Sequence, residues 1–167
     1  MLFVITGNGK GKTTSAIGMG IRAVGADRKV LMVQFLKTGS SSEVKVLKEL
    51  GSFTVKSFGR KGFIVNKITD QDIELAEQGL IYTRQALEND SCDFLVLDEL
   101  CVTLHFNLLQ LNNVLSLLKE YKDKKHIVIT GRKCPQEIIE IADLVTECKE
   151  IKHYYNKGVS QEKGIEF

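Results

Sequence analysis

Residues 2–14 have the sequence LFVITGNGKGKTT, and this stretch decides the fold. Its first part, Leu2–Thr6, predicts a buried strand, and residues 7–12 form a glycine-rich turn. Residues 13–24 predict a helix that stops at Gly25. Between a strand and a helix, such glycines allow successive backbone N–H groups to wrap around an anion, and the helix N-terminus adds a partial positive charge. The stretch therefore predicts a phosphate-binding loop, or P-loop.

Two side chains of this loop have predicted roles. Lys12 is expected to lie in a solvated loop, where its positive charge would contact phosphate oxygens. The Thr13 hydroxyl would ligate Mg²⁺. The common spacing G-x-x-x-x-G-K-[ST] would need glycine at position 6, where the chain has Thr6. Counted from Gly7, the loop is one residue short. We therefore expect ATP binding, but ordinary transfer of the γ-phosphoryl group does not follow.

The remainder of the chain alternates short apolar runs with longer periodic segments. Further strands are expected at residues 30–35, 53–58, 94–97, 127–129 and 144–145, the second of them at a sheet edge because its apolar residues alternate. Helices are expected at residues 43–50, 70–89, 108–118 and 137–142, with Thr69 or Asp70 capping the second. Strands of uniform apolarity separated by helices predict a single α/β domain, residues 1–167, with a mostly parallel sheet and helices on both faces.

The composition is that of one soluble domain. The chain has 167 residues, 43% hydrophobic and 26% charged, which matches about one domain of ordinary size. Lysine and arginine number 23 against 21 acidic residues, giving a net charge of +2. This balance gives no electrostatic reason to expect nucleic acid or an anionic membrane as a partner. No apolar run approaches the ~20 residues of a membrane span.

The four cysteines have no spacing typical of a metal site. No CxxC pair occurs, so they are expected to be small hydrophobic side chains in a reducing compartment. This expectation places the protein in the cytoplasm. The cysteines are Cys92, Cys101, Cys134 and Cys148.

An acidic pair follows the apolar run FLVL at residues 94–97. Asp98 and Glu99 would stand at the carboxyl end of a buried strand, where ligands bind in open α/β sheets. Either carboxylate could hold Mg²⁺ directly or through water. The alternative is a pair of acids in a solvated turn between strand and helix, and the predicted loop favours the metal site.

Several lesser candidates keep two interpretations each. Arg132 follows another buried strand and could clamp a phosphate or lie on the surface. Gln34, Lys37 and Thr38 follow the second strand and have the same alternatives. Residues 59–63, GRKGF, form either a mobile surface loop or a ligand lid. No nucleophile elbow, paired catalytic histidine or kinase signature is present.

The motifs together resemble the P-loop type of ATP:corrinoid adenosyltransferase. The similarity covers nearly the whole chain. Its blocks are GNGKGKTT at 7–14, VQFLK at 33–37, LDEL at 97–100, TGR at 130–132 and, toward the end, ADLVTE at 142–147, KH at 152–153, GV at 158–159 and GIEF at 164–167.

This resemblance implies a RecA-like fold, a homodimer and a flavoprotein electron donor. The implied reaction transfers the 5′-deoxyadenosyl group of ATP to the cobalt of a reduced corrinoid and releases triphosphate. The family binds ATP in the reverse sense from most P-loop enzymes, which suits the short loop. The implied triphosphate ligands are Asn8, Gly9, Lys10, Gly11, Lys12, Thr13 and Thr14. Mg²⁺ is implied at Thr13 and Glu99 with Asp98 beside them, the nucleotide sugar at Arg22, and a further nucleotide contact at Arg132.

The resemblance also suggests how the corrinoid is handled. Four-coordinate Co(I) is a strong nucleophile, so attack on the ribose 5′ carbon requires no general base. In the family, a Phe and a Trp in a G-F-x-W stretch displace the lower ligand of the cobalt. Here Phe63 matches the Phe, and Val65 stands where the family has Trp. The implied catalytic side chains are thus Lys12, Phe63 and Arg132.

Two departures and two competing functions accompany this interpretation. Family members commonly carry an N-terminal extension, part of which covers the active site, whereas here the first predicted strand follows directly on Met1. The sequence has Gln161-Glu162 where the family has Ala-Gln. The alternatives are a RecA-like ATPase or small-molecule kinase, which would release ADP, and a nucleotide-sensing module without turnover.

Overall fold

The computed structural model describes residues 1–61 and 68–166. Their centre is a six-stranded sheet in the order β3-β2-β4-β5-β1-β6, with every neighbouring pair parallel. Parallel strands of this kind require crossover connections, and helices supply them. The strands are β1 (Leu2–Thr6), β2 (Val30–Phe35), β3 (Phe53–Phe58), β4 (Phe94–Asp98), β5 (His126–Thr130) and β6 (Leu144–Glu147).

Burial along each strand follows its place in the sheet. All six residues of β2 and all five of β4 are buried, because helices cover both faces of these central strands. β3 alternates between buried and exposed side chains at its start and lies at one edge, as predicted. β6 is exposed along its length and forms the other edge.

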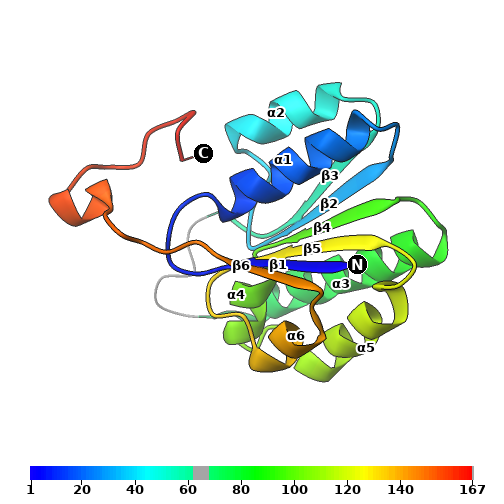
Figure 1. Cartoon of the computed structure of the whole chain (residues 1–167). Helices are drawn as coiled ribbons and strands as arrows, with labels where there is room; N and C mark the ends of the chain where they lie inside the picture. Colours follow the sequence, from blue (N-terminus) through cyan, green and yellow to red (C-terminus); the bar gives the residue numbers. More distant parts are fainter. Residues whose placement is uncertain (62–67, 167) are drawn as a thin grey trace.

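Helices cover the two faces of the sheet in separate layers. α1 and α2 lie on one face, and α3, α4, α5 and α6 lie on the other (Figure 1). Two hydrophobic clusters correspond to these layers, one including Ala16 and Leu47, the other including Ala76, Leu117 and Ile138. The helices are α1 (Lys12–Val24), α2 (Ser42–Glu49), α3 (Asp70–Glu88), α4 (Leu100–His105), α5 (Leu111–Tyr121) and α6 (Gln136–Ile141).

The start of α3 confirms one of the two predicted caps. Thr69 is the N-cap residue, and the Asp72 carboxylate accepts hydrogen bonds from the Thr69 backbone N–H at 2.9 Å and its hydroxyl at 2.7 Å. Arg60 forms an ion pair with Asp72 at 2.7 Å. Arg60 therefore contacts α3, while residues 62 and 63 of the segment predicted as a mobile loop or a ligand lid lie outside the described residues.

The predicted helix at 108–118 is wrong at its beginning. α5 starts at Leu111, and a separate helix, α4, follows directly after the acidic pair. A turn with Asn107 at φ 55° lies between them, and the Leu108 N–H donates to the Thr103 carbonyl. Leu108 is buried, so its apolar side chain belongs to the core although its backbone is not helical.

The final segment leaves the sheet after β6. It contains a short 3₁₀ helix, η1 (Tyr154–Lys157).

All four cysteines are free thiols, of which Cys92 and Cys101 are buried and the other two are half-buried. None of the helices within residues 1–61 and 68–166 is long and apolar enough to cross a membrane.

Candidate functional site at the carboxyl end of the sheet

The glycine loop is held against the strand end of β6. The Gly9 N–H donates to the Cys148 carbonyl at 2.7 Å. A Cβ on Gly7 would lie 2.5 Å from the Cys148 carbonyl oxygen, and a Cβ on Gly9 would lie 2.7 Å from that of Lys149. Gly7 and Gly11 have φ of 97° and 107°, which side chains rarely tolerate. Glycine is therefore required by both close packing and backbone conformation.

Lys12 is the first residue of α1 and is buried, contrary to the expected solvated loop. Its Nζ donates to the Gly9 carbonyl at 2.6 Å, so the side chain curls back into the loop. Burial lowers the pKa of Lys12, and the positive charge of Arg132 lowers it further. The ammonium group thus lies in a site that favours the approach of an anion.

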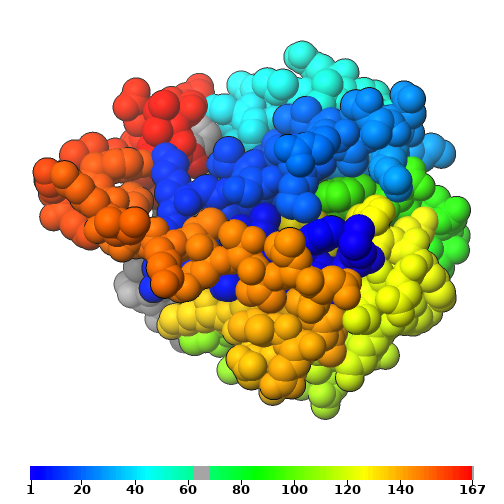
Figure 2. Space-filling model, viewed as in Figure 1, coloured from blue at the N-terminus to red at the C-terminus, as the bar shows by residue number. Residues whose placement is uncertain are grey.

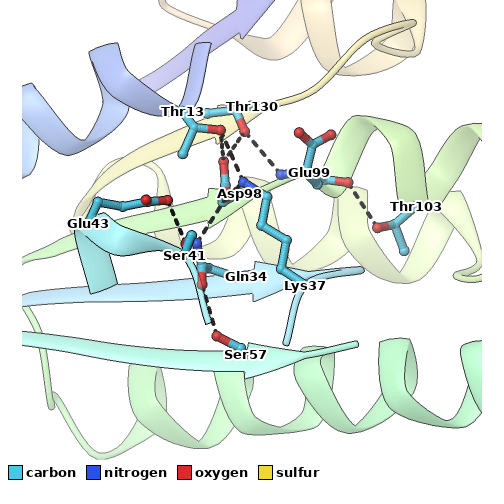
Figure 3. A network of polar contacts seen from close by, with 10 residues as sticks. All are labelled: Thr13, Gln34, Lys37, Ser41, Glu43, Ser57, Asp98, Glu99, Thr103 and Thr130. Atoms are coloured by element: carbon cyan, nitrogen blue, oxygen red, sulfur yellow. Dashed lines mark hydrogen bonds and ion pairs between the residues drawn. The ribbon is translucent and has the colours of Figure 1, made fainter. Parts of the chain in front are cut away.

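Asp98 is the centre of the polar network in Figure 3. Its carboxylate is fully buried at the end of β4. Oδ1 accepts hydrogen bonds from the hydroxyls of Thr13 at 2.8 Å and Thr130 at 2.7 Å. Oδ2 accepts from Lys37 Nζ at 2.7 Å and, more weakly, from Gln34 Nε2 at 3.4 Å. Three segments distant from Asp98 in the sequence therefore meet at its carboxylate.

The sheet order explains this meeting. β4 and β5 are neighbours, and β5 is followed by β1, so the ends of β4, β5 and β1 share one edge. Thr130 ends β5, and its hydroxyl also accepts from the Glu99 N–H at 3.0 Å. Gln34 in β2 is oriented by the Ser57 hydroxyl of β3, 2.9 Å from its amide oxygen. The strands β2, β3, β4 and β5 each contribute one polar side chain, and α1 contributes Thr13.

Glu99 lies beside this network and points away from it (Figure 3). Its backbone is left-handed, with φ 61°, and it caps α4. The carboxylate makes no hydrogen bond with any residue among 1–61 and 68–166. Burial raises the pKa of Glu99, and the neighbouring Asp98 raises it further. A half-buried acid in this position can accept a cation or a donor from a ligand.

The two arginines predicted near the nucleotide lie in different places. Arg132 follows β5 and is exposed, and its charge acts on both Lys12 and Glu99. Arg22 is exposed in the last turn of α1. At 1.5 Å rise per residue, it stands roughly 15 Å from Lys12 along the helix axis. The structure brings Arg132 to the site and leaves Arg22 at the far end of α1.

Lys10, another predicted triphosphate ligand, contacts the C-terminal segment instead. Its Nζ donates to the Tyr154 hydroxyl at 2.9 Å and the Ile165 carbonyl at 2.9 Å, and it pairs with Glu166 at 2.7 Å. Tyr154 and Glu166 also hydrogen-bond to each other. The bond to Lys10 is the main cause that lowers the pKa of Glu166. Figure 2 shows this segment, orange to red, projecting beside the blue loop.

The remaining predicted residues are placed as follows. Asn8 and Thr14 are exposed at the loop and the first turn of α1, where a ligand can reach them. Phe63 and Val65 lie outside the described residues.

The donor set suits a magnesium ion that arrives with phosphates. Within residues 1–61 and 68–166, no three His, Cys, Asp or Glu side chains gather as a metal site. Mg²⁺ is commonly held by one or two carboxylates together with substrate phosphates, rather than by a protein cage. Thr13, Asp98 and Glu99 supply such a partial set.

Two functional features were missed by sequence reasoning: the role of Thr130 and the contacts of Lys10. Thr130 is a fully buried polar residue in an otherwise apolar strand, and so is Gln34, for which the sequence left a phosphate contact and a surface position open. A polar side chain in a buried strand requires a partner, and this could have marked both as part of a network. The contacts of Lys10 with the C-terminal segment join residues more than 140 positions apart. No local pattern announces them.

The all-parallel sheet, the order of its strands and the helices that connect them define the α/β architecture of RecA-like P-loop proteins. The model of the family ATP:corrinoid adenosyltransferase BtuR/CobO/CobP matches residues 1–167, and the chain belongs to this family.

Curated relatives agree with this membership over the full chain. The corrinoid adenosyltransferase of Escherichia coli strain K12 is 36% identical over 169 residues, covering 100% of this chain and 85% of that protein. The Pseudomonas aeruginosa PAO1 corrinoid adenosyltransferase is 36% identical over 171 residues, with 100% and 83% covered. Corrinoid adenosyltransferase CobA of Salmonella typhimurium LT2 is 35% identical over 169 residues, with 100% and 85% covered.

Proposed function

We propose that this protein transfers the 5′-deoxyadenosyl group of ATP to the Co(I) centre of a reduced corrinoid, forming adenosylcobalamin or a precursor and releasing triphosphate. Family membership over residues 1–167 supports the reaction class. The observation that carries the site assignment is the contact of Thr13 in the short loop with the buried carboxylate of Asp98.

This reaction depends on the positioning of its two reactants and requires no proton transfer by the protein. The cobalt electron pair forms the Co–C bond to the 5′ carbon, and the C–O bond breaks with its electrons leaving on triphosphate. The protein must hold the 5′ carbon in line with the cobalt and stabilise the leaving charge. The short loop and its buried Lys12 suit the second task.

The triphosphate is assigned to Asn8, Gly9, Lys10, Gly11, Lys12, Thr13 and Thr14. Lys12 and Arg132 supply positive charge. Burial lowers the pKa of Lys12 most and the charge of Arg132 lowers it further, and an anion between the two side chains would offset their repulsion. Lys10 would reach a phosphate after leaving Glu166. Arg22 would contact the nucleotide sugar only if the nucleotide extends along α1, or if Arg22 acts on the site of another copy.

The metal is assigned to Thr13 and Glu99, with Asp98 beside them. When bound, Mg²⁺ would offset negative charge on the triphosphate. Asp98 accepts the Thr13 hydroxyl hydrogen and so leaves that oxygen's lone pairs available to a cation.

The corrinoid side rests on the family resemblance. Phe63 is proposed to exclude the lower ligand of the cobalt, with Val65 in the place of the family's Trp. A homodimer, a flavoprotein electron donor and a cytoplasmic location belong to the same proposal.

One incubation tests the function against its competitors. The protein is mixed with ATP, Mg²⁺ and chemically reduced cobalamin, and the products are separated. Adenosyl transfer gives a light-sensitive corrinoid together with triphosphate. An ATPase or a kinase gives ADP, and a nucleotide-sensing module gives neither, so either result would overturn the proposal.

A further inference from the structure

Lys37 lies between Thr13 and Asp98, two of the three residues to which the proposed function assigns the metal site. Its Nζ lies 2.7 Å from Asp98 Oδ2 and 3.3 Å from Thr13 Oγ1 (Figure 3). The contact with Asp98 is an ion pair, and the Asp98 carboxylate is fully buried. The ammonium group therefore stands beside Asp98 as a positive charge.

The hydrogen bonds determine which lone pairs a cation could use. The Thr13 hydroxyl donates its single hydrogen to Asp98 Oδ1, so it turns oxygen lone pairs toward Lys37. Oδ1 of Asp98 already accepts two hydroxyl groups. Oδ2 accepts Lys37 at close range and Gln34 at 3.4 Å. On Thr13 and Asp98, the lone pairs left for a cation are thus those that Lys37 contacts.

The backbone beside Lys37 is unusual in two ways. Leu36 is left-handed, with φ 60°, although it is not glycine, and its N–H donates to the Phe58 carbonyl at 3.0 Å. Gly59 packs so closely that a Cβ there would lie 2.3 Å from the Lys37 nitrogen. Rare backbone conformations persist where the surrounding structure enforces them, and they concentrate at functional sites. Here both features fix the point from which the Lys37 side chain reaches Asp98.

We infer that the Lys37 ammonium is a built-in substitute for the divalent cation. In the nucleotide-free protein it neutralises the buried carboxylate of Asp98 and keeps the position between Asp98 and Thr13 filled. A metal ion that uses the Thr13 oxygen has to displace it. This inference rests on the metal assignment in the proposed function and adds a specificity element, because free Mg²⁺ without triphosphate would be excluded.

The test measures metal binding without nucleotide or corrinoid. Mn²⁺ is titrated into wild-type protein and the Lys37→Met variant, and free Mn²⁺ is followed by electron paramagnetic resonance. We expect Lys37→Met to bind Mn²⁺ about tenfold or more tightly than wild type, because a positive charge beside the metal position is removed. Lys37→Arg, which keeps the charge, should resemble wild type, as should the surface control Lys45→Met.

The outcomes separate this inference from its alternatives. The gain in Mn²⁺ affinity of Lys37→Met should disappear in the double variant Lys37→Met/Asp98→Asn. This loss would show that the added metal binds at Asp98. Equal Mn²⁺ affinity in wild type and Lys37→Met would overturn the inference, as would an equal gain in Lys37→Arg. Because the assay contains no ATP, its result is independent of whether adenosyl transfer occurs.

Loss of folding in Lys37→Met would also be informative. Met at this position leaves the Asp98 charge without its ion pair, so the variant is refolded at graded Mg²⁺ concentrations and followed by circular dichroism. Recovery that depends on Mg²⁺ supports the inference, since the metal then replaces the ammonium. Recovery indifferent to Mg²⁺, or no recovery at any concentration, contradicts it.

Discussion

The Thr13 hydroxyl oxygen and Asp98 Oδ1 lie 2.8 Å apart, although 85 positions separate the two residues in the chain. The contact joins the first turn of α1 to the end of β4. Because β5 lies between β4 and β1 in the sheet, Thr130 of β5 donates to the same oxygen and closes the arrangement. The loop and the acidic strand end are thus fixed relative to each other before any ligand arrives.

Substitution of Lys12 should separate ligand binding from folding. Lys12→Ala removes a charge-assisted contact to the triphosphate worth about 1.5–3 kcal/mol, so ATP affinity should fall about 10- to 100-fold. The variant should still give a native circular dichroism spectrum, since the lysine contributes one bond to Gly9. Calorimetric titration with ATP measures the effect. Lys48→Ala, on the exposed side of α2, is the control. Wild-type ATP affinity in Lys12→Ala would show that the loop does not bind the triphosphate.

Glu99 should govern the magnesium requirement. Glu99→Gln replaces a half-buried carboxylate by a neutral amide of the same shape, so the Mg²⁺ concentration for half-maximal adenosyl transfer should rise by on the order of tenfold. The exposed Glu49→Gln should leave it unchanged. An identical metal titration in Glu99→Gln and wild type would transfer the metal role to Asp98.

Two glycines should respond in opposite directions to a methyl group. Gly9→Ala places a Cβ 2.7 Å from the Lys149 carbonyl oxygen and should cost about 1–3 kcal/mol of unfolding free energy while displacing the loop. Gly18→Ala, in α1 with nothing within 4 Å of the new Cβ, should stabilise by roughly 0.5–1 kcal/mol. Chemical denaturation measures both. Stabilisation in Gly9→Ala would show that the loop is not packed against the end of β6.

Acid should weaken the anchor between Arg60 and Asp72. The hydrogen bond from Arg60 and those from Thr69 lower the pKa of Asp72 from 3.8 to about 2. Since the folded-state pKa lies below the unfolded value, the stability it contributes is complete above pH 3.8 and is lost as the pH falls toward 2. The unfolding free energy of Asp72→Asn should therefore change less with pH across this window than that of wild type. Asp70→Asn, exposed in the same turn, should follow wild type.

The order and type of most elements follow from local sequence. The strand–glycine–helix stretch at 2–14, the edge position of β3 and the Thr69 cap were all predictable, because each depends on periodicity or on residues within one turn. The start of α5 was not. Leu108 continues the apolar spacing of the helix. Only the turn at Asn107 shows that Leu108 is buried in the core without being part of the helix.

The candidate site was predictable to a smaller extent. Asp98, Glu99 and Thr13 could be chosen because their strand and helix positions predict one sheet edge. The environment of Lys12 was predicted wrongly, since its burial depends on packing by residues distant in sequence. The orientation of the Lys37 side chain toward Asp98 also depends on such packing, through the backbone of Leu36 and the close approach of Gly59.

The position of β1 has a consequence for how the protein reaches its native state. Leu2 pairs with Ile127 and Phe3 with Leu144, so each pairing closes a loop of more than a hundred residues. Such distant pairings carry a large entropy of closure and form slowly. Until β1 inserts between β5 and β6, the inner edge of β5 is an unprotected template for other chains. We therefore expect competence to bind nucleotide to be acquired late in refolding, and aggregation to compete most strongly with productive folding before that step.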